Sequence, residues 1–158
     1  MMPWIIYKTK SALQIEVDKE RQVVFFTFAK AKEGVAGLPK KGEKRYEWED
    51  KIVFALSPEE AFDIALQAKD ILEGRKESLE LYHRPMPNSS REEDKILSFR
   101  PAETGNTQAF ITISQGENKI AVGLSRGDLF RLATALPIVV APLLFIEREG
   151  GIKQTEER

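Results

Sequence analysis

Two related segments decide the fold of this chain: KIVFALSPEEAFDIA at residues 51–65 and KIAVGLSRGDLFRLA at residues 119–133. In each segment a run typical of a strand leads directly into a helical pattern. A serine stands at the junction, Ser57 or Ser125, with an acidic residue three positions later, which is the pattern of a helix capping box. The recurrence predicts that the chain contains an internal duplication.

Short runs rich in β-branched and aromatic residues lie upstream of both helices and predict strands. The expected strands span residues 4–10, 13–17, 22–30 and 45–56 in the first half, and 79–83, 95–100, 107–114 and 119–124 in the second. Most of the turns between them are short enough for antiparallel hairpins. The predicted fold class is α+β, a duplicated ββββα unit with two antiparallel four-stranded sheets packed with two helices.

Length and termini give the expected organisation. We expect a single domain over residues 1–147, with pseudo-repeats at about 4–74 and 78–146, and a flexible charged tail at 148–158. The first residues lack the features of a signal or transit peptide. We therefore expect the protein to be cytoplasmic or nucleoid-associated, or to lie in an organelle if the chain is a processed form.

Composition excludes several function classes. Lys and Arg (24) nearly cancel Asp and Glu (25), so any nucleic-acid surface must be a local patch. The absence of cysteine and the presence of only one histidine, His83, exclude disulfides, thiolate catalysis and zinc sites built from Cys and His. No nucleophile with a base and no Gly-rich loop opening a helix is apparent. We expect no catalytic residues, no metal and no cofactor, with His83 packed or solvated.

Basic and aromatic residues supply the main functional signal. KTKSAL at residues 8–13 is followed by Tyr46-Glu47-Trp48. Lysines bind phosphate, and aromatic rings stack on unpaired bases. In an extended strand Lys8 and Lys10 would leave the same face of the sheet. A solvated strand face is the alternative for the lysine pair, and a continuation of the core stripe is the alternative for Tyr46 and Trp48.

The segment from Lys30 to Arg45 adds a local positive loop, with six basic and two acidic residues. Strand parity places Phe26 and Phe28 on one face and Phe25 on the other, so one set is core and the other is free to form a platform. We assign Phe26 and Phe28 to the site. The candidate nucleic-acid-binding residues are Tyr7, Lys8, Lys10, Phe26, Phe28, Lys30, Arg45, Tyr46, Trp48 and Lys51.

The second helix is apolar nearly all round, from Leu129 to Phe145, more than a monomer of this size is expected to cover. This predicts a subunit interface, with an ordinary buried C-terminal helix as the alternative. The longest apolar run, residues 136–146, has 11 residues and two prolines. A membrane span needs about 20, so we expect no membrane association. The candidate interface residues are Leu129, Leu132, Leu136, Val139 and Leu143.

Over residues 6–146 the chain resembles the Whirly family of single-stranded DNA-binding proteins. Residues 8–13 match the family signature Lys-Gly-Lys-Ala-Ala-Leu, with Thr9 in place of the glycine and Ser11 in place of an alanine. Tyr46-Glu47-Trp48 is similar to the family's Tyr-Asp-Trp, and VFALS at 53–57 to its Val-Phe-Ser-Leu-Ser. Further on, Tyr82-His83-Arg84-Pro85 resembles its Phe-His-Asp-Pro, and Pro142 falls where the last helix of the family also has a proline.

The resemblance implies a homotetramer with its helices in the centre and single-stranded DNA along the sheet edges between neighbouring protomers. Binding by stacking and backbone contacts is largely indifferent to sequence. Roles in genome maintenance, DNA repair or transcription would follow. The alternative is a single-stranded RNA-binding or purely scaffolding oligomer of the same fold. No feature of the sequence recognises a 2′-hydroxyl, so the sequence does not distinguish DNA from RNA.

Overall fold

The computed structural model describes residues 3–33, 45–85 and 93–145. It contains two antiparallel four-stranded sheets, ordered β1-β2-β3-β4 and β5-β6-β7-β8, and a helix follows each sheet. This confirms the predicted fold class. The first half comprises β1 (Trp4–Tyr7), β2 (Ser11–Asp18), β3 (Val23–Lys30), η1 (Trp48–Asp50), β4 (Ile52–Leu56) and α1 (Pro58–Leu72). The second comprises β5 (Leu79–His83), β6 (Lys95–Thr104), β7 (Thr107–Gln115), β8 (Asn118–Leu124), α2 (Arg126–Val140) and η2 (Ala141–Leu144).

Both helices begin at the capping boxes that the sequence predicts. The Ser57 hydroxyl accepts from the backbone N–H of Glu60 at 3.1 Å, and the Glu60 carboxylate accepts from the N–H of Ser57 at 3.0 Å. Ser125 and Asp128 make the same two bonds at 3.2 and 2.9 Å. Past the end of α1, Gly74 has a φ of +89°, a left-handed conformation that suits glycine. Local side-chain chemistry therefore marks where these helices start.

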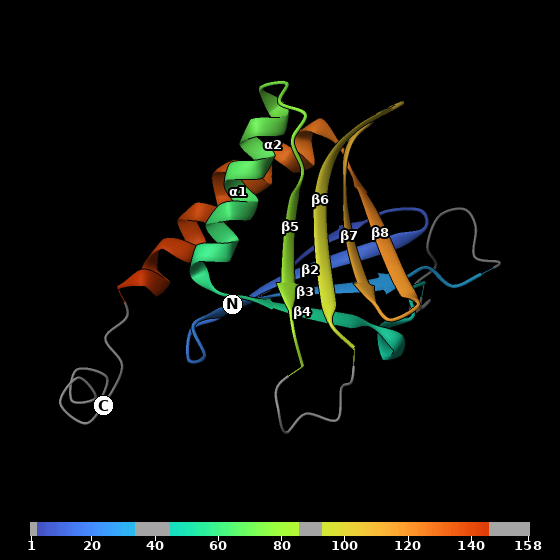
Figure 1. The fold of residues 1–158 in the computed structure, drawn as a ribbon, viewed down its shortest axis with the longest axis horizontal. Helices are drawn as coiled ribbons and strands as arrows, with labels where there is room; N and C mark the ends of the chain where they lie inside the picture. Colours follow the sequence, from blue (N-terminus) through green and yellow to red (C-terminus); the bar gives the residue numbers. More distant parts are fainter. Residues whose placement is uncertain (1–2, 34–44, 86–92, 146–158) are drawn as a thin grey trace.

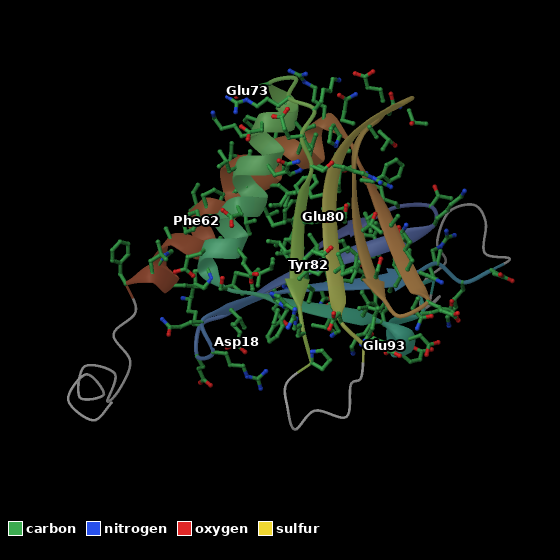
Figure 2. The ribbon with its side chains drawn as sticks, viewed as in Figure 1. Asp18, Phe62, Glu73, Glu80, Tyr82 and Glu93 are labelled. Atoms are coloured by element: carbon green, nitrogen blue, oxygen red, sulfur yellow. The ribbon has the colours of Figure 1, made fainter. Side chains whose placement is uncertain are left out.

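One hydrophobic core draws on the inner faces of both sheets and on both helices. The two sheets cross one another, and α1 and α2 lie side by side at one end (Figure 1). Side chains fill the space between the layers, while Tyr82 on β5 stays exposed (Figure 2). The largest fully buried side chains include Phe26, Phe28, Phe54 and Phe99. Phe26 and Phe28 are therefore core residues, and their assignment to the binding site is wrong.

Two predicted strands are shorter than expected. The strand expected over 4–10 ends at Tyr7, and the chain turns there, with the N–H of Lys8 donating to the carbonyl of Ser11 at 2.9 Å. The strand expected over 45–56 begins only at Ile52, after the short helix η1. The stretch before Ile52 is rich in acidic residues, which are poor strand formers, and this favours the turn.

Helix α2 supplies one apolar stripe to the core of its own chain. Leu129, Leu132 and Leu136 on α2 and Leu143 on η2 are buried in that core, so these four predicted interface residues are not available to another subunit, whereas Val139 packs against the core and is only partly buried. Burial recurs every three or four residues, as one face of a helix requires. The exposed large apolar side chains of α2 and of the η2 segment that follows it are what we call the α2 outer surface. Its members are Phe130, Ile138, Leu144 and Phe145, which are 61, 72, 46 and 83% exposed.

The 19 residues of Arg126–Leu144 are long and apolar enough, by length and composition, to cross a membrane, with a mean hydropathy of 1.5. A helix that contributes to the core of a soluble domain passes the same test, and α2 buries such a stripe among the strands and α1. Length and hydropathy are thus weak evidence for a membrane span here.

Gln67 is a buried polar residue that sequence reasoning missed. Its side-chain amide donates to the carbonyls of Glu77 at 2.8 Å and Phe99 at 3.0 Å, which ties α1 to β6 and to the segment before β5. We expect Gln67→Leu to lower the free energy of unfolding by about 1–3 kcal/mol, because the carbonyl of Phe99 loses its partner in the interior and that of Glu77 loses a partly buried one. Urea denaturation measures this. Leu66→Ala, at the exposed neighbour, should change stability by no more than about 0.5 kcal/mol, and equal effects of the two changes would refute the account.

Candidate nucleic-acid interface

The outer face of the first sheet carries a site built around Tyr46. Strand pairing places Ala12 opposite Ala29, and these two small side chains leave room for the Tyr46 ring above them. The Tyr46 hydroxyl donates to the backbone carbonyl of Lys8 at 2.6 Å. Burial raises the pKa of Tyr46, the Arg45 charge opposes this rise and Tyr7 adds to it, which leaves the pKa above its ordinary value. The hydroxyl is therefore protonated at neutral pH and holds the ring in place.

Two further rings flank Tyr46. The Tyr7 and Tyr46 ring centroids lie 5.6 Å apart with planes tilted by 35°, and those of Tyr46 and Trp48 lie 6.2 Å apart at 55°. We call Tyr7, Tyr46 and Trp48 the aromatic cluster. Tyr7 is 60% exposed, and Trp48 is half-buried against Ala12, Ala29 and Tyr46. Because η1 interrupts strand parity, Tyr46 and Trp48 lie on the face opposite the core stripe of β4.

A shallow hollow of about 370 Å³ opens beside Trp48 on the same outer face. Phe25, which sequence reasoning left out of the site, is part of its lining, and the Arg21 guanidinium carbon lies 5.9 Å from the Phe25 ring centroid. Parity had separated Phe25 from Phe26 and Phe28 correctly, but the wrong set was assigned to the surface. The lining residues are Gln14, Glu16, Phe25, Thr27, Trp48, Lys51 and Val53.

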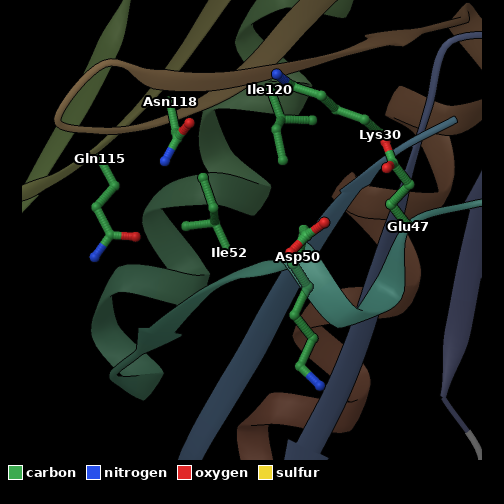
Figure 3. Close-up of a pocket in the computed structure, with 8 residues that line it drawn as sticks. Lys30, Glu47, Asp50, Ile52, Gln115, Asn118 and Ile120 are labelled. Atoms are coloured by element: carbon green, nitrogen blue, oxygen red, sulfur yellow. The ribbon is translucent and has the colours of Figure 1, made fainter. Parts of the chain in front are cut away.

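A second hollow, of about 360 Å³, lies between η1 and the β7–β8 hairpin (Figure 3). Lys30 and Lys51 line it together with Glu47 and Asp50, so its charges balance. Lys51 borders both hollows, whereas Lys30 lines only this one. The remaining lining residues are Ile52, Gln115, Asn118 and Ile120.

The structure separates the two lysines of the 8–13 segment. The Lys8 ammonium lies 2.6 Å from the Asp128 carboxylate at the start of α2, whereas Lys10 is exposed in the β1–β2 turn. Burial raises the pKa of Asp128, but the bonds to Lys8 and Ser125 and the Lys8 charge more than offset this, so the pKa lies below its ordinary value of 3.8. The pair does not form the single face that an extended strand would give. Arg45, the last residue of the positive segment that begins at Lys30, is half-buried. Residues 34–44 of that segment lie outside the described residues.

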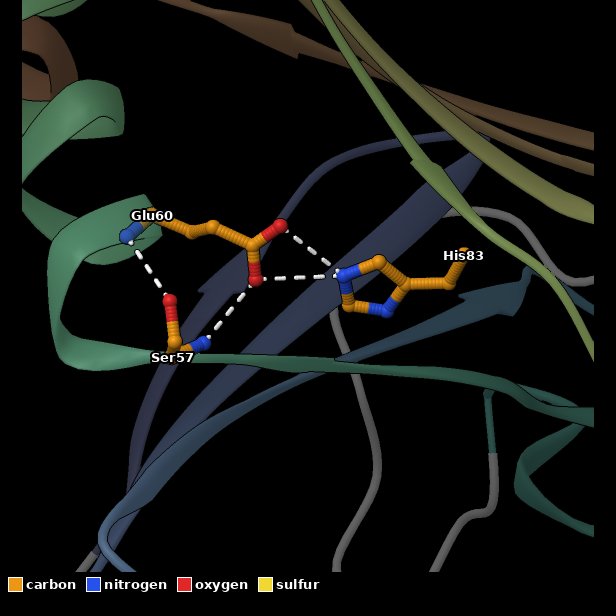
Figure 4. A network of polar contacts seen from close by, with 3 residues as sticks. All are labelled: Ser57, Glu60 and His83. Carbon is orange, nitrogen blue, oxygen red and sulfur yellow. Dashed lines mark hydrogen bonds and ion pairs between the residues drawn. The ribbon is translucent and has the colours of Figure 1, made fainter. Parts of the chain in front are cut away.

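His83 is a packed residue. Its ring stacks on Phe54 with centroids 3.9 Å apart and planes 15° apart, and Nε2 contacts the Glu60 carboxylate at 2.9 and 3.1 Å (Figure 4). Glu60 is at the same time the acid of the α1 capping box. Among the described residues, no group of three or more His, Cys, Asp and Glu could hold a metal ion.

The lowered pKa of Asp128 gives stability a defined pH dependence. The ionised Asp128 carboxylate stabilises the folded state fully at pH values above 3.8, the ordinary pKa of the group. This contribution is lost as the pH falls through the lower pKa that Asp128 has in the folded state. We expect the loss of stability caused by Asp128→Asn to be largest at neutral pH and to shrink as pH falls below 3.8. Urea midpoints from pH 7 to about pH 3 test this. A pH-independent loss would contradict it, and Glu80→Gln, at an exposed acid, is the control.

The chain is similar in sequence to a known family model and to a known protein over most of its length. The model described as "Whirly transcription factor" matches residues 6–135. The chain is similar to the mitochondrial single-stranded DNA-binding protein WHY2 of Arabidopsis thaliana, 32% identical over 177 aligned positions that cover 98% of this chain and 67% of WHY2.

Two solved structures share the fold. The plant transcriptional regulator PBF-2 has a TM-score of 0.67 and 24% identity, covering 92% of this chain and 91% of that one. WHY3 from Arabidopsis thaliana has a TM-score of 0.63 and 22% identity, covering 91% and 89%. The sequence match over most of the chain and this common architecture lead to one conclusion: the chain belongs to the Whirly family.

Proposed function

We propose that this protein binds single-stranded DNA, with little sequence preference, across the outer face of its first sheet. The observation that carries the proposal is the aromatic cluster, whose Tyr7 ring is 60% exposed; Lys51 lines the hollow beside Trp48, and Lys10 is exposed in the β1–β2 turn that follows Tyr7. Its similarity to WHY2, a protein named for single-stranded DNA binding, supports the same class of ligand.

The chemistry of this face suits unpaired bases. Every base has a π-face, so a ring that is open on one side stacks on any of them, and this contributes roughly 1–3 kcal/mol per base. Tyr46 and the alanines beneath it hold the cluster rigidly, so little side-chain entropy is lost on binding. Lys10 and Lys51 supply charge for phosphates, which carry no sequence information. No chemical step on the nucleic acid follows from this arrangement.

We further propose that the protein forms a homo-oligomer, a tetramer being the expected form, through the α2 outer surface rather than through the buried leucines. The four exposed apolar side chains of that surface support this, because such patches mark interaction sites. An assembly would repeat the DNA-binding face and add avidity along a long strand.

The cellular role follows from the ligand. Protection of transiently single-stranded genomic DNA would place the protein in genome maintenance, repair or transcription. WHY2 is named as mitochondrial, and we propose either an organelle or the cytoplasm and its nucleoid as the site of action. Single-stranded RNA is the second candidate ligand, because stacking and phosphate contacts serve both polymers.

Preference for single strands is the first test. We expect a mixed-sequence DNA oligomer of about 16 nucleotides to bind about tenfold or more tighter than its duplex, because pairing hides the base faces. Fluorescence anisotropy measures both affinities, and a matched RNA oligomer in the same experiment decides between the two polymers. Equal affinity for oligomer and duplex would sink the proposal.

The contributions of charge and of stacking to the binding free energy should differ in their dependence on salt concentration. Tyr7→Ala and Trp48→Ala should each lose roughly 1–3 kcal/mol of binding free energy, and this loss should persist as salt rises. Lys10→Ala or Lys51→Ala should instead reduce the slope of log affinity against log salt by about 0.7. Tyr82→Ala, which removes an equally exposed ring from the second sheet, is the matched control and should leave affinity unchanged. If Trp48→Ala lowers the melting temperature but not the affinity, its ring is structural.

Assembly can be tested apart from folding. Ile138→Asp places a charge on the α2 outer surface, so we expect a smaller particle in light scattering with an unchanged thermal melt of the protomer. Leu132→Asp places the charge in the protomer's own core and should prevent folding. An unmodified protein that is monomeric would refute the assembly proposal.

A further inference from the structure

Sequence predicts that Lys8 contacts phosphate, but in the structure both its side chain and its backbone carbonyl bind other residues of the chain. The Lys8 side chain ends on Asp128, 2.6 Å away, and Asp128 also caps α2 through Ser125. The Lys8 backbone carbonyl accepts the hydroxyl of Tyr46, the central ring of the aromatic cluster. One residue therefore joins the start of α2 to the centre of the candidate DNA-binding face.

A second contact holds the same turn to the second half of the chain. The Ser11 hydroxyl donates to the backbone carbonyl of Ala121 in β8 at 2.7 Å. Lys8 and Ser11 stand at the two ends of the β1–β2 turn, and the N–H of Lys8 donates to the Ser11 carbonyl. Both side chains point to the second half, which leaves the exposed Lys10 between them as the turn's lysine for phosphate.

The duplication provides an independent parallel. His83, at the end of β5, contacts Glu60, the acid of the α1 capping box, just as Lys8, after β1, contacts Asp128, the acid of the α2 capping box (Figure 4). In each case a cationic or protonatable residue at the end of the first strand of one half binds the helix N-terminus of the other half. The same geometric position thus has a structural part in both halves.

We propose that Lys8 is a positioning residue: its ion pair with Asp128 fixes the β1–β2 turn and, through the Tyr46 hydroxyl, the orientation of the aromatic cluster that binds single-stranded nucleic acid. This rests on the proposed function. It makes Asp128, which no nucleic acid would contact, a determinant of affinity. If Lys8 instead bound phosphate, Asp128 would compete with the ligand, and removing its charge would strengthen binding.

Binding measurements separate the two accounts. On the full chain, we expect Lys8→Met and Asp128→Asn each to weaken binding of the single-stranded oligomer roughly two- to tenfold, with the salt slope unchanged. Tighter binding by Asp128→Asn, or a slope reduced by about 0.7 in Lys8→Met, would overturn the proposal. Lys76→Met is the matched control, because it breaks an exposed ion pair of 2.8 Å with Glu103 and should change neither quantity.

A readout without DNA keeps this test separate from the proposed function. In a Trp4→Phe background Trp48 is the only tryptophan. We expect acrylamide to quench it more strongly in Lys8→Met and in Asp128→Asn, but not in Lys76→Met. Unchanged quenching in both would overturn the positioning role even if DNA binds, whereas increased quenching in a protein that binds no DNA would leave the role standing and refute the function.

The double variant guards against simple unfolding. Lys8→Met combined with Asp128→Asn leaves no unpaired buried charge, and the amide side chain that the second substitution introduces retains an oxygen for the capping bond. We expect the double variant to melt cooperatively and to show the weakened binding and increased quenching of the single variants. Wild-type affinity and quenching in the folded double variant would overturn the proposal.

Discussion

The candidate site depends on one hydrogen bond, from the hydroxyl of Tyr46 to the backbone carbonyl of Lys8. Past the end of β3, the segment containing Tyr46 is joined by a bridge between Ala31 and Tyr46, with backbone bonds from the Lys32 N–H to the Arg45 carbonyl at 2.7 Å and from the Glu47 N–H to the Lys30 carbonyl at 2.8 Å. These backbone bonds place the segment, and the Tyr46 hydroxyl bond together with the fit of its ring over Ala12 and Ala29 fixes the orientation of the side chain. The Tyr46 ring is itself buried, at 9% exposed, so it supports Tyr7 and Trp48, which both pack against it, while the Tyr7 ring is open to solvent.

The outer face of the first sheet is open because the fold covers only one face of each sheet. Both sheets and both helices share a single core, which leaves the opposite face of the first sheet without a covering layer among the described residues. The outward-facing side of a solvated sheet is usually polar, whereas this open face carries small and aromatic residues. The helix N-termini are linked to the sheets, because the acid of each capping box also contacts a residue at the end of a strand from the other half. Fold and site are therefore joined through the helix N-termini.

Sequence predicted what local chemistry decides. Capping boxes and runs of strand-forming residues depend on neighbours a few residues away, and the duplication repeats these signals in both halves. Sequence did not predict which face of β3 would turn inward, because parity separates Phe25 from Phe26 and Phe28 without saying where the core lies. For the same reason it could not choose which stripe of α2, apolar on several sides, would be buried.

Other features depend on partners far along the chain. The ion pair of Lys8 with Asp128 and the two carbonyl bonds of Gln67 join elements that only the folded topology brings together. Tyr46 and Trp48 were predicted as site candidates with the core as alternative, and η1, a helical turn within an apparent strand, decides their face. A run of acidic residues beside Trp48 was the available signal for that turn.

The central claim is that nucleic acid lies on the aromatic cluster of the first sheet. Ultraviolet cross-linking of the wild-type protein to a bromouracil-substituted single-stranded oligomer, followed by mass-spectrometric mapping of the modified peptides, tests it most directly. The account predicts cross-links in the peptides that contain Tyr7 and Trp48. Cross-links confined to the second sheet, for instance at the equally exposed Tyr82, would contradict it.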